Sequence, residues 1–456
     1  MDLVKDPYPA GSLTRSTTLK SSCHKALVCA REKVTIPRDE LGDSMNKIQA
    51  WLRSHQDQMA DELEQLCNMN SGSDNVFGLN RVAEWLTEYF SPLEAPCKKL
   101  ELPSFQTVDD RGEMCSYATG HALRWDLPGT STDKKHRLLL NIHYDTVYGL
   151  SNSFQECERY EGSDLNGQTE LRMRGPGVID AKGGIVVLRW AAIAAKRFLD
   201  LSNLDLSVVL TPDEEIGSPA SIKLWKKMAP KFDFAMLYEP TLADGSLVSE
   251  RKGTGTFIFI VRGKSAHSGR NFHDGRNAIT HACKVALAMD ALNGLRSDVT
   301  VNVGRVRGGD AVNVVPDLAA LRINVRISSR EDQEWLEDQV QRIFHLHHKP
   351  EDGFRIELHG GIRAAPKTID SSTSEWMDLI QRAGASIEES IRWKPSGGAS
   401  DGSKLAALGL SNIDTFGPEG DLLHSDQEWV CLSSLPRKAA LTVAVIEAIL
   451  KQCGDR

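Results

Sequence analysis

The stretch LLLNIHYD at residues 138–145 is the best guide to the fold. In it a short apolar run is followed directly by His143 and Asp145, whose side chains can bind metal ions or accept protons. Such a run is typical of a strand buried on both faces, as in a parallel sheet. Two similar runs follow, SVVLT at residues 207–211 and FAML at residues 234–237, and acidic residues come soon after each. A helical pattern at residues 183–199 separates the first two runs. Strands that alternate with helices predict an α/β domain, in which a mixed or parallel sheet has helices on both faces.

The segments around this sheet have other patterns. Residues 45–67 have the apolar spacing of one amphipathic helix, and residues 79–90 that of a second. From about residue 253, alternating polar and apolar residues predict half-exposed strands, in the order strand–helix–strand–strand–helix–strand. That order is typical of a small α+β open-faced sandwich, which we expect to be inserted in the α/β domain.

The 456 residues exceed one compact domain, which normally has about 100–200 residues. We predict that residues 44–251 and 363–456 together form a catalytic α/β domain. Residues 252–362 are expected to form the inserted lid. Residues 1–43 read as a polar N-terminal extension that is poorly ordered or acts as an arm.

The composition excludes several classes of function. Lysine and arginine total 54 against 62 aspartates and glutamates, a net charge of −8 that gives no general attraction to nucleic acid or to an anionic membrane. No apolar run approaches the roughly 20 residues that a membrane helix needs. Nine cysteines, an odd number, favour reduced thiols, and the N-terminal residues lack the apolar core of a secretory signal. We therefore expect a cytoplasmic protein.

His143 and Asp145 follow the first apolar run directly. Ligands of open α/β sheets bind at the carboxyl ends of the strands. Side chains at positions i and i+2 of an extended chain point the same way. His143 is therefore a candidate metal ligand, and Asp145 a candidate partner that fixes the imidazole tautomer. The alternative is an ordinary histidine at a strand end with a capping aspartate.

Four further acids and one histidine are likewise expected at or near strand ends of this one sheet. Asp180 lies in RGPGVIDAKGG and is expected either to bridge two metal ions or to cap a helix. Glu214 and Glu215 are expected either to divide the work, one as ligand and one as proton acceptor, or to form a solvated acidic loop. Glu239 and His424, taken singly, are ordinary surface positions.

Taken together, these residues point to metal chemistry. Mixed histidine and carboxylate ligation suits zinc, and two ions can share a bridging carboxylate. Such a centre activates a water molecule near neutral pH and polarises a carbonyl group. The reaction that these residues predict is the hydrolysis of an amide.

Eight motifs occur in one order, namely HYDTVYG, GPGVIDAKGG, PDEEIGS, YEPT, GKSAHSG, NVVPD, GGASDG and LHSD. Together they resemble the M20 family of metallopeptidases and deacylases, over roughly residues 45–453. The likeness is strongest to the branch of glutamate carboxypeptidases of the carboxypeptidase G type. It implies a catalytic domain with an inserted lid that mediates dimerisation.

The resemblance also implies roles for the strand-end residues. It implies two Zn²⁺ ions, for which Co²⁺ can substitute, held by His143, Asp180, Glu215, Glu239 and His424. Asp180 would bridge the ions, and Glu214 would be the general base. Asp145 would support His143.

Residues of the lid receive roles by the same resemblance. His267 would reach the active site of the partner subunit in a homodimer and stabilise an oxyanion. Asn313 and Arg326 would hold the carboxylate of the substrate. The family often has an acid where Asn324 stands, so this part of the pattern is incomplete.

The loop GGASDG completes the implied site. The backbone of Gly398 and Ala399 would contact the substrate, whereas Asp401 either contacts it or supports the loop. Ala399 and Ser400 match neither the desuccinylase nor the carboxypeptidase pattern fully, so they leave the specificity open.

The sequence thus predicts a metal-dependent hydrolase that uses a metal-bridging water to cleave an amide next to a free carboxylate. The product would be a C-terminal residue released from a peptide or an N-acyl amino acid, and the resemblance suggests glutamate as that residue. One alternative is an N-acyl-amino-acid deacylase of the acetylornithine or succinyl-diaminopimelate type. Another is an inert metal-binding member of the family, against which the presence of Glu214 argues.

Overall fold

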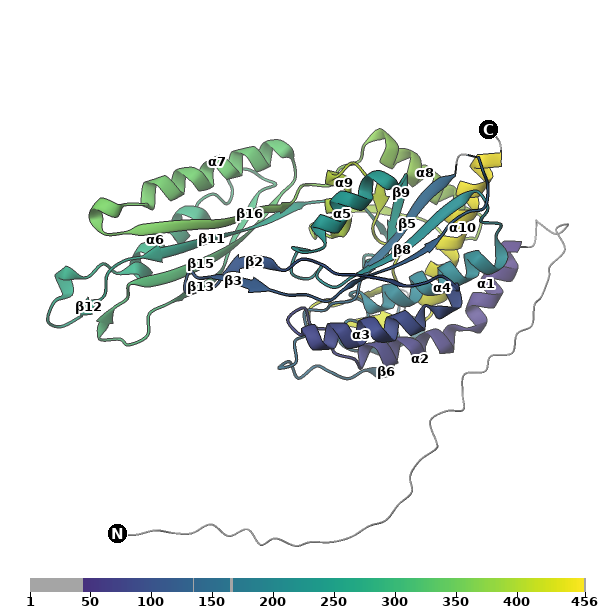
Figure 1. Cartoon of the computed structure of the whole chain (residues 1–456), viewed down its shortest axis with the longest axis horizontal. Helices are drawn as coiled ribbons and strands as arrows, with labels where there is room; N and C mark the ends of the chain where they lie inside the picture. Colours follow the sequence, from purple (N-terminus) through teal and green to yellow (C-terminus); the bar gives the residue numbers. More distant parts are fainter. Residues whose placement is uncertain (1–43, 134, 165–166, 455–456) are drawn as a thin grey trace, which may run out of the picture. The chain divides into compact units, whose positions relative to one another are not determined.

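The computed structural model describes residues 44–133, 135–164 and 167–454, so the predicted N-terminal extension lies outside the described residues. A six-stranded sheet forms the centre of the larger part (Figure 1). Its strand order is β1 (Lys98–Leu100), β4 (Ala122–Leu127), β8 (Leu204–Thr211), β5 (His136–His143), β9 (Phe234–Leu237) and β18 (Asn412–Ile413). Strand β5 runs parallel to β8 and β9, whereas β4 is antiparallel to β8. The sheet is therefore mixed, which is one of the two alternatives, mixed or parallel, that the sequence predicted.

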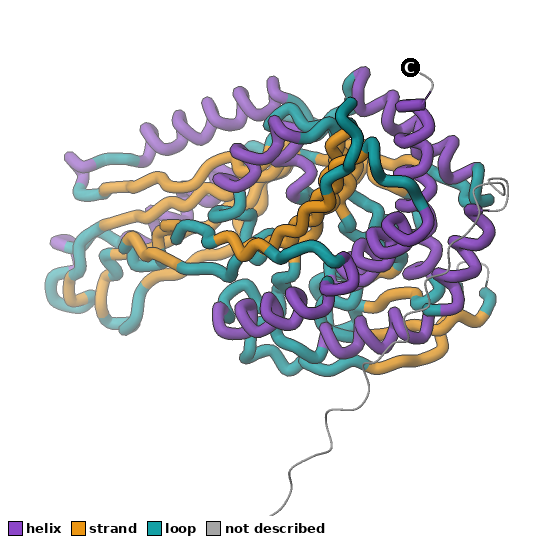
Figure 2. The backbone as a smooth tube through the Cα atoms, turned by 45° about the vertical axis from the view of Figure 1, so that its right-hand side comes forward, coloured by secondary structure: helices purple, strands orange, loops and turns teal. Residues whose placement is uncertain are grey.

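Alternate residues of β5 point to opposite faces of this sheet, and helices cover both (Figure 2). Leu138 and Leu140 lie in the core formed with α4 (Lys182–Phe198) and α10 (Ser434–Gly454). Leu139 packs with residues of α5 (Ile222–Met228) and α9 (Asp401–Ala407). Helices α3 (Val76–Tyr89) and α8 (Ser371–Ala385) also belong to this part. No helix of the described residues is long and apolar enough to cross a membrane.

The prediction of one helix over residues 45–67 was wrong. The structure has two helices, α1 (Ser44–Ser54) and α2 (Gln56–Cys67), with a break at His55. The His55 N–H bonds to the carbonyl of Leu52, and the His55 Nδ1 atom lies 2.7 Å from the carbonyl oxygen of Trp51. Both helices bury their apolar residues in the same core, so the apolar spacing continues across the break.

The inserted part contains a four-stranded antiparallel sheet, which we call the lid sheet. Its order is β13 (Thr300–Gly308), β15 (Leu318–Ile327), β11 (Gly253–Arg262) and β16 (Arg355–Ala364). Helices α6 (Ala278–Asp290) and α7 (Arg330–His347) pack on one face of it, around a separate apolar core. This arrangement confirms the predicted α+β open-faced sandwich, while the boundaries at residues 252 and 362 stay a prediction.

The chain enters and leaves the lid at one place. The backbones of Arg251 and Lys367 donate hydrogen bonds to each other's carbonyl groups, both at 2.9 Å. Arg251 ends β10 (Leu247–Arg251), which pairs with β17 (Trp393–Ser396) of the larger part. The two connections therefore form a double-stranded stalk.

A hairpin of the larger part, β2 (Phe105–Val108) and β3 (Met114–Tyr117), reaches the lid sheet (Figure 1). Val108 packs against Ile258 and Ile260, on the face of the lid sheet opposite its helices. The carboxylate of Asp110 accepts a hydrogen bond from Arg322 Nε at 2.9 Å and pairs with Arg305. The hairpin is thus a second attachment of the lid, apart from the stalk.

We expect the ion pairs of Asp110 to be measurable in a double-mutant cycle. Replacing Asp110 and Arg322 by alanine, singly and together, should give a coupling energy of about 1 kcal/mol in urea unfolding, since the pair is partly exposed. The Arg330–Glu334 pair on α7 is far more exposed and serves as the control, with an expected coupling of about 0.3 kcal/mol. Equal coupling in the two cycles would contradict a fastening role for Asp110.

Candidate metal centre

His143 is the last residue of β5, and its side chain is 1% exposed. Its Nε2 atom lies 3.1 Å from Asp180 Oδ1 and 3.6 Å from Glu239 Oε2. Glu239 follows β9, the neighbouring strand of the same sheet. The carboxyl ends of two parallel strands thus bring a histidine and a carboxylate together, as the sequence predicted.

Asp180 and His424 come from another sheet, which corrects the expectation that all site residues follow strands of one sheet. Asp180 lies between β7 (Thr169–Arg174) and α4, and His424 follows β19 (Gly420–Asp421). These strands belong to a four-stranded sheet with β6 (Glu158–Ser163) and β20 (Trp429–Cys431). The loops that leave this sheet carry the two side chains to the ends of the central strands.

The carboxylate of Asp180 lies between two histidines. Its Oδ1 faces His143, and its Oδ2 lies 3.3 Å from the Nε2 atom of His424. The same nitrogen is 3.2 Å from Glu215 Oε2, and Glu215 Oε1 is a buried oxygen without a hydrogen-bond partner among the described residues. Donor atoms of His143, Asp180 and Glu215 all lie within 4.8 Å of one another. This set of nitrogen and carboxylate donors fits divalent cations that share Asp180.

Asp180 does not cap helix α4. The helix begins after Ala181, which makes no side-chain capping bond. The glycines that follow allow close packing, since a Cβ atom on Gly184 would lie 2.1 Å from the carbonyl oxygen of Tyr238. The carboxylate of Asp180 therefore contacts His143 and His424 instead of the first turn of the helix.

The carboxylate of Asp145 is fully buried and joins two parts of the site. It accepts hydrogen bonds from the backbone N–H groups of Glu214 and Glu215, at 3.0 and 3.2 Å. The Nδ1 atom of His143 lies 3.0 Å from the carbonyl oxygen of Asp145 and 3.3 Å from its Oδ1. Asp145 thus orients the ring of His143 and fixes the acidic loop.

Glu428 supports the centre from the other side, and the sequence reasoning missed it. Its Oε1 accepts from the backbone N–H groups of Ile179 and Asp180, at 3.0 and 3.2 Å. Tyr148 donates its hydroxyl to Glu428 Oε2 at 2.5 Å and lies 2.8 Å from the carbonyl of Ser425, next to His424. Glu428 follows the LHSD motif by only a few residues, but an isolated buried glutamate gives no pattern that sequence analysis can use.

The crowding of acids changes how these groups ionise. Burial and the nearby Asp180 raise the pKa of Glu215 to about 8. Hydrogen bonds to Asp180 and Glu215 raise the pKa of His424 to about 11. Burial opposes ionisation of Asp180, but bonds from His143 and His424 outweigh it and lower the pKa of Asp180. The cluster needs positive charge nearby, which bound cations would supply.

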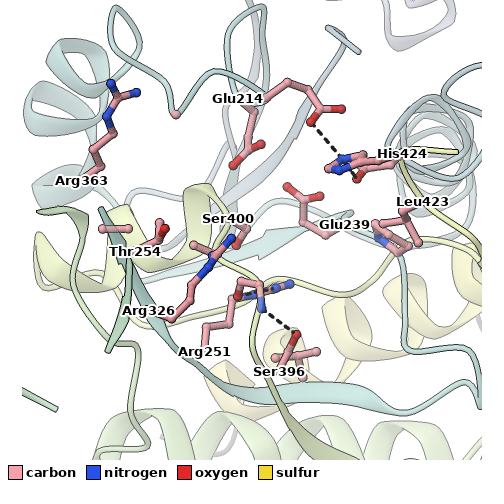
Figure 3. Close-up of a pocket in the computed structure, with 18 of the residues that line it drawn as sticks. Glu214, Glu239, Arg251, Thr254, Arg326, Arg363, Ser396, Ser400, Leu423 and His424 are labelled. Carbon is pink, nitrogen blue, oxygen red and sulfur yellow. Dashed lines mark hydrogen bonds and ion pairs between the residues drawn. The ribbon is translucent and has the colours of Figure 1, made fainter. Parts of the chain in front are cut away.

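A cavity of about 690 Å³ opens over this cluster. Glu214, Glu215, Glu239 and His424 line one part of it, and Arg326 and Thr254 of the lid sheet line another (Figure 3). Arg326 is half-buried, and burial lowers the pKa of its guanidinium. A cation from the lid and the acidic cluster therefore share one cavity.

The residues of the GGASDG loop differ in whether they line this cavity. Gly398 and Ala399 line it, while their contact with substrate stays a prediction; Asp401 is buried and does not line it. Asp401 instead pairs with Lys404, so it supports the loop. The sequence reasoning did not single out the cations that line the cavity besides Arg326, namely Arg251, Arg363 and Lys404.

His267 and Asn313 do not line this cavity. His267 ends β12 (Ala266–His267), which pairs with β14 (Val314–Val315), and the Ser268 N–H donates to the carbonyl of Asn313. The structure thus brings these two residues near each other on the lid but apart from the acidic cluster. Their roles stay a prediction.

A family model for peptidase family M20/M25/M40 matches residues 139–448. The chain belongs to peptidase family M20/M25/M40. The match extends from the strand that carries His143 to the last helix, and it confirms the resemblance on which the sequence analysis relied.

Relatives within the family are both carboxypeptidases and deacylases. Carboxypeptidase G2 of Pseudomonas sp. strain RS-16 is 24% identical over 398 residues, which are 84% of this chain and 87% of that protein. The putative succinyl-diaminopimelate desuccinylase DapE of Mycobacterium tuberculosis H37Rv is 29% identical over 323 residues, covering 68% and 82%. The solved Bacillus subtilis YXEP protein, a dinuclear metal-binding peptidase of the M20 family, has a TM-score of 0.56, 15% identity and coverage of 87% and 99%. This chain is therefore an M20-type hydrolase.

Proposed function

We propose that this M20 member removes a C-terminal residue, with glutamate as the first candidate, from a small peptide or an N-acyl amino acid. The observation that carries the proposal is the cavity itself. Its wall combines carboxylates and His424, with His143 buried behind Asp180, and a lid arginine that can hold a free carboxylate. Carboxypeptidase G2 among the relatives supports the same direction of cleavage.

The proposed cofactor is a pair of Zn²⁺ ions, for which Co²⁺ can substitute. His143 and Glu239 would hold one ion, Glu215 and His424 the other, and Asp180 both. When bound, such ions activate water near neutral pH and polarise the carbonyl that is to be cleaved. Asp145 keeps the ring of His143 in place.

Glu214 would act as the general base. Its side chain lines the cavity. Among the described residues, its carboxylate forms no ion pair with His143 or His424. It would accept a proton from the attacking water and pass that proton to the leaving amine. Its backbone N–H is fixed by Asp145, which places the base relative to the metal ligands.

The remaining contacts to substrate are proposed from the lid and the loop after β17. Arg326 would bind the free carboxylate through its planar fork, and Gly398 and Ala399 would offer backbone groups. His267 would enter the cavity of a partner subunit, which requires a homodimer formed through the lid. Asn313 would help Arg326 to hold the free carboxylate of the substrate. We place the enzyme in the cytoplasm, which nine scattered cysteines support.

A deacylase of the acetylornithine or succinyl-diaminopimelate type is the second candidate. The desuccinylase relative favours it, whereas Ala399 matches neither branch fully and leaves the specificity open. A substrate of the succinyl type carries a carboxylate on the acyl side of the amide, whereas a carboxypeptidase substrate and an N-acetyl amino acid carry theirs on the amine side. An inert metal-binding protein is the third and weakest, because the cavity keeps Glu214.

A substrate panel tests the proposal. Zinc-loaded protein is assayed with N-acyl amino acids and dipeptides that vary in the C-terminal residue and in the acyl group. We expect turnover to depend on the free C-terminal carboxylate and to vanish after chelation. Preference for an acyl carboxylate with any amine would favour the desuccinylase alternative, and no hydrolysis by fully loaded protein would refute both.

We expect Arg326→Ala to raise KM for carboxylate substrates about 10- to 100-fold. The reason is that the variant loses a charge-assisted hydrogen bond, which contributes about 1.5–3 kcal/mol to binding. The change in kcat should be smaller, because Arg326 contacts the carboxylate rather than the reacting carbonyl. Arg342→Ala, on the exposed surface of α7, is the control and should keep the wild-type KM. An amide-capped substrate should lose the difference between wild type and Arg326→Ala.

A further inference from the structure

Lys404 is a buried cation in the wall of the proposed active site. It lies on α9, its side chain is only 5% exposed, and it lines the same cavity as Glu214. A buried ammonium group is unfavourable unless other groups compensate its charge and satisfy its hydrogen bonds. The partners of Lys404 therefore show what it does.

Two partners fix the position of the ammonium group. Asp401 Oδ1 lies 2.9 Å from Lys404 Nζ, and the hydroxyl of Ser218 lies 2.7 Å from it. Asp401 is itself held, since Trp225 Nε1 donates to its other oxygen at 3.0 Å and Ser218 donates to Oδ1. The ammonium is thus anchored without any contribution from Glu214.

The third partner is Glu214, whose Oε1 lies 3.7 Å from Lys404 Nζ. Among the described residues, no other lysine, arginine or histidine is recorded within 4 Å of this carboxylate. The acidic loop turns sharply behind it, where Gly217 has a φ of 90° and donates its N–H to the carbonyl of Glu214 at 2.7 Å. The backbone of Glu214 is therefore fixed, while its flexible side chain has one cation to orient it.

We propose that Lys404 is a positioning residue for Glu214, and that its anchored ammonium holds the Glu214 carboxylate in the cavity wall beside the metal ligands. The inference rests on the proposed function, in which Glu214 handles the proton. A compact ammonium suits this task, because it attracts a carboxylate oxygen without competing for a fixed bidentate geometry. Without it, Glu214 could adopt other rotamers, including ones that face away from the substrate.

The test compares Lys404→Met with wild type in the zinc-loaded enzyme. Methionine keeps an unbranched side chain of similar length and removes the charge. We expect kcat to fall about 10- to 100-fold, as part of the 10²–10⁴ that general base catalysis contributes. KM and zinc content should stay within about twofold. Lys404→Arg keeps the charge and should recover most of the lost kcat.

Lys438→Met is the matched control. Lys438 is equally buried on α10 and pairs with Glu419 Oε1 at 3.0 Å, but it does not line the cavity. This variant should lower the melting temperature and leave kcat unchanged. Lys404→Met leaves the buried charge of Asp401 unpaired, which can impair folding. If folding is impaired, the double variant Lys404→Met/Asp401→Asn, which removes this charge, is used in place of the single variant.

A crystal structure of Lys404→Met decides the matter independently of activity. A displaced or multiply oriented Glu214 side chain supports the proposal. An unmoved Glu214, or a kcat within twofold of wild type, overturns it. If the wild-type enzyme hydrolyses nothing in the panel, the proposed function fails, whereas the position of Glu214 in the variant still decides the role of Lys404.

Discussion

Glu214→Gln should lower kcat by about 1000-fold or more while the protein keeps its fold and its zinc. Glutamine has the same shape but accepts no proton at neutral pH, so the water loses its base and the leaving amine its acid. Burial raises the pKa of Glu214, and Lys404 opposes that effect. The measurements are kcat on the best substrate of the panel, zinc by mass spectrometry, and the melting temperature.

The control for this experiment is Glu88→Gln, an exposed position on α3, which should behave as wild type. Retained turnover in Glu214→Gln with intact zinc would show that another group handles the proton. Loss of zinc together with turnover would instead make Glu214 a metal ligand and exchange its role with that of Glu215.

Asp180→Ala should have the second large effect, on metal content rather than on proton transfer. Both oxygens of Asp180 face a histidine, so the change removes one donor from each proposed ion at once. We expect the protein to lose at least one of its two zinc equivalents. We expect kcat to fall by about 1000-fold or more. Equilibrium dialysis against zinc and calorimetric titration measure the loss without any assay of activity.

Asp57→Ala, at an exposed position of α2, provides the comparison and should bind zinc as wild type does. Full zinc occupancy in Asp180→Ala would contradict a bridging role. The melting temperature separates the two causes of lost metal, because an unfolded protein would lose zinc for reasons unrelated to the donor set.

The central sheet was predictable because its strands are buried on both faces. Such strands appear as short uninterrupted apolar runs, and LLLNI, SVVLT and FAML all became neighbouring strands. His143 and Glu239 then follow from the rule that ligands gather at carboxyl ends. The helix break at His55 was not predictable, since apolar spacing continues through it into the same core.

The place of Asp180 needed the structure. Its backbone N–H bonds to Glu428, which lies 248 residues away, and the strand before it belongs to a separate sheet. No local pattern encodes such a contact, so the residues alone left Asp180 either as a shared ligand or as a helix cap, and the resemblance to the M20 family favoured the shared ligand. Lys404 escaped notice for a related reason. A lysine in a short helix reads as a surface charge, and its burial depends on Asp401 and Ser218.

The double attachment of the lid has a mechanical consequence. A lid joined only by the stalk could both bend and rotate about the stalk. A second attachment at a distance from the stalk prevents the rotation. The hairpin supplies the fastening at Arg322, four residues along β15 from Arg326. Arg363, on β16, also donates to the carbonyl of Ile216 in the acidic loop at 2.9 Å. In the proposed function, the fixed distance between Arg326 and the proposed metal ligands would select substrates by the separation of their carboxylate from the scissile bond.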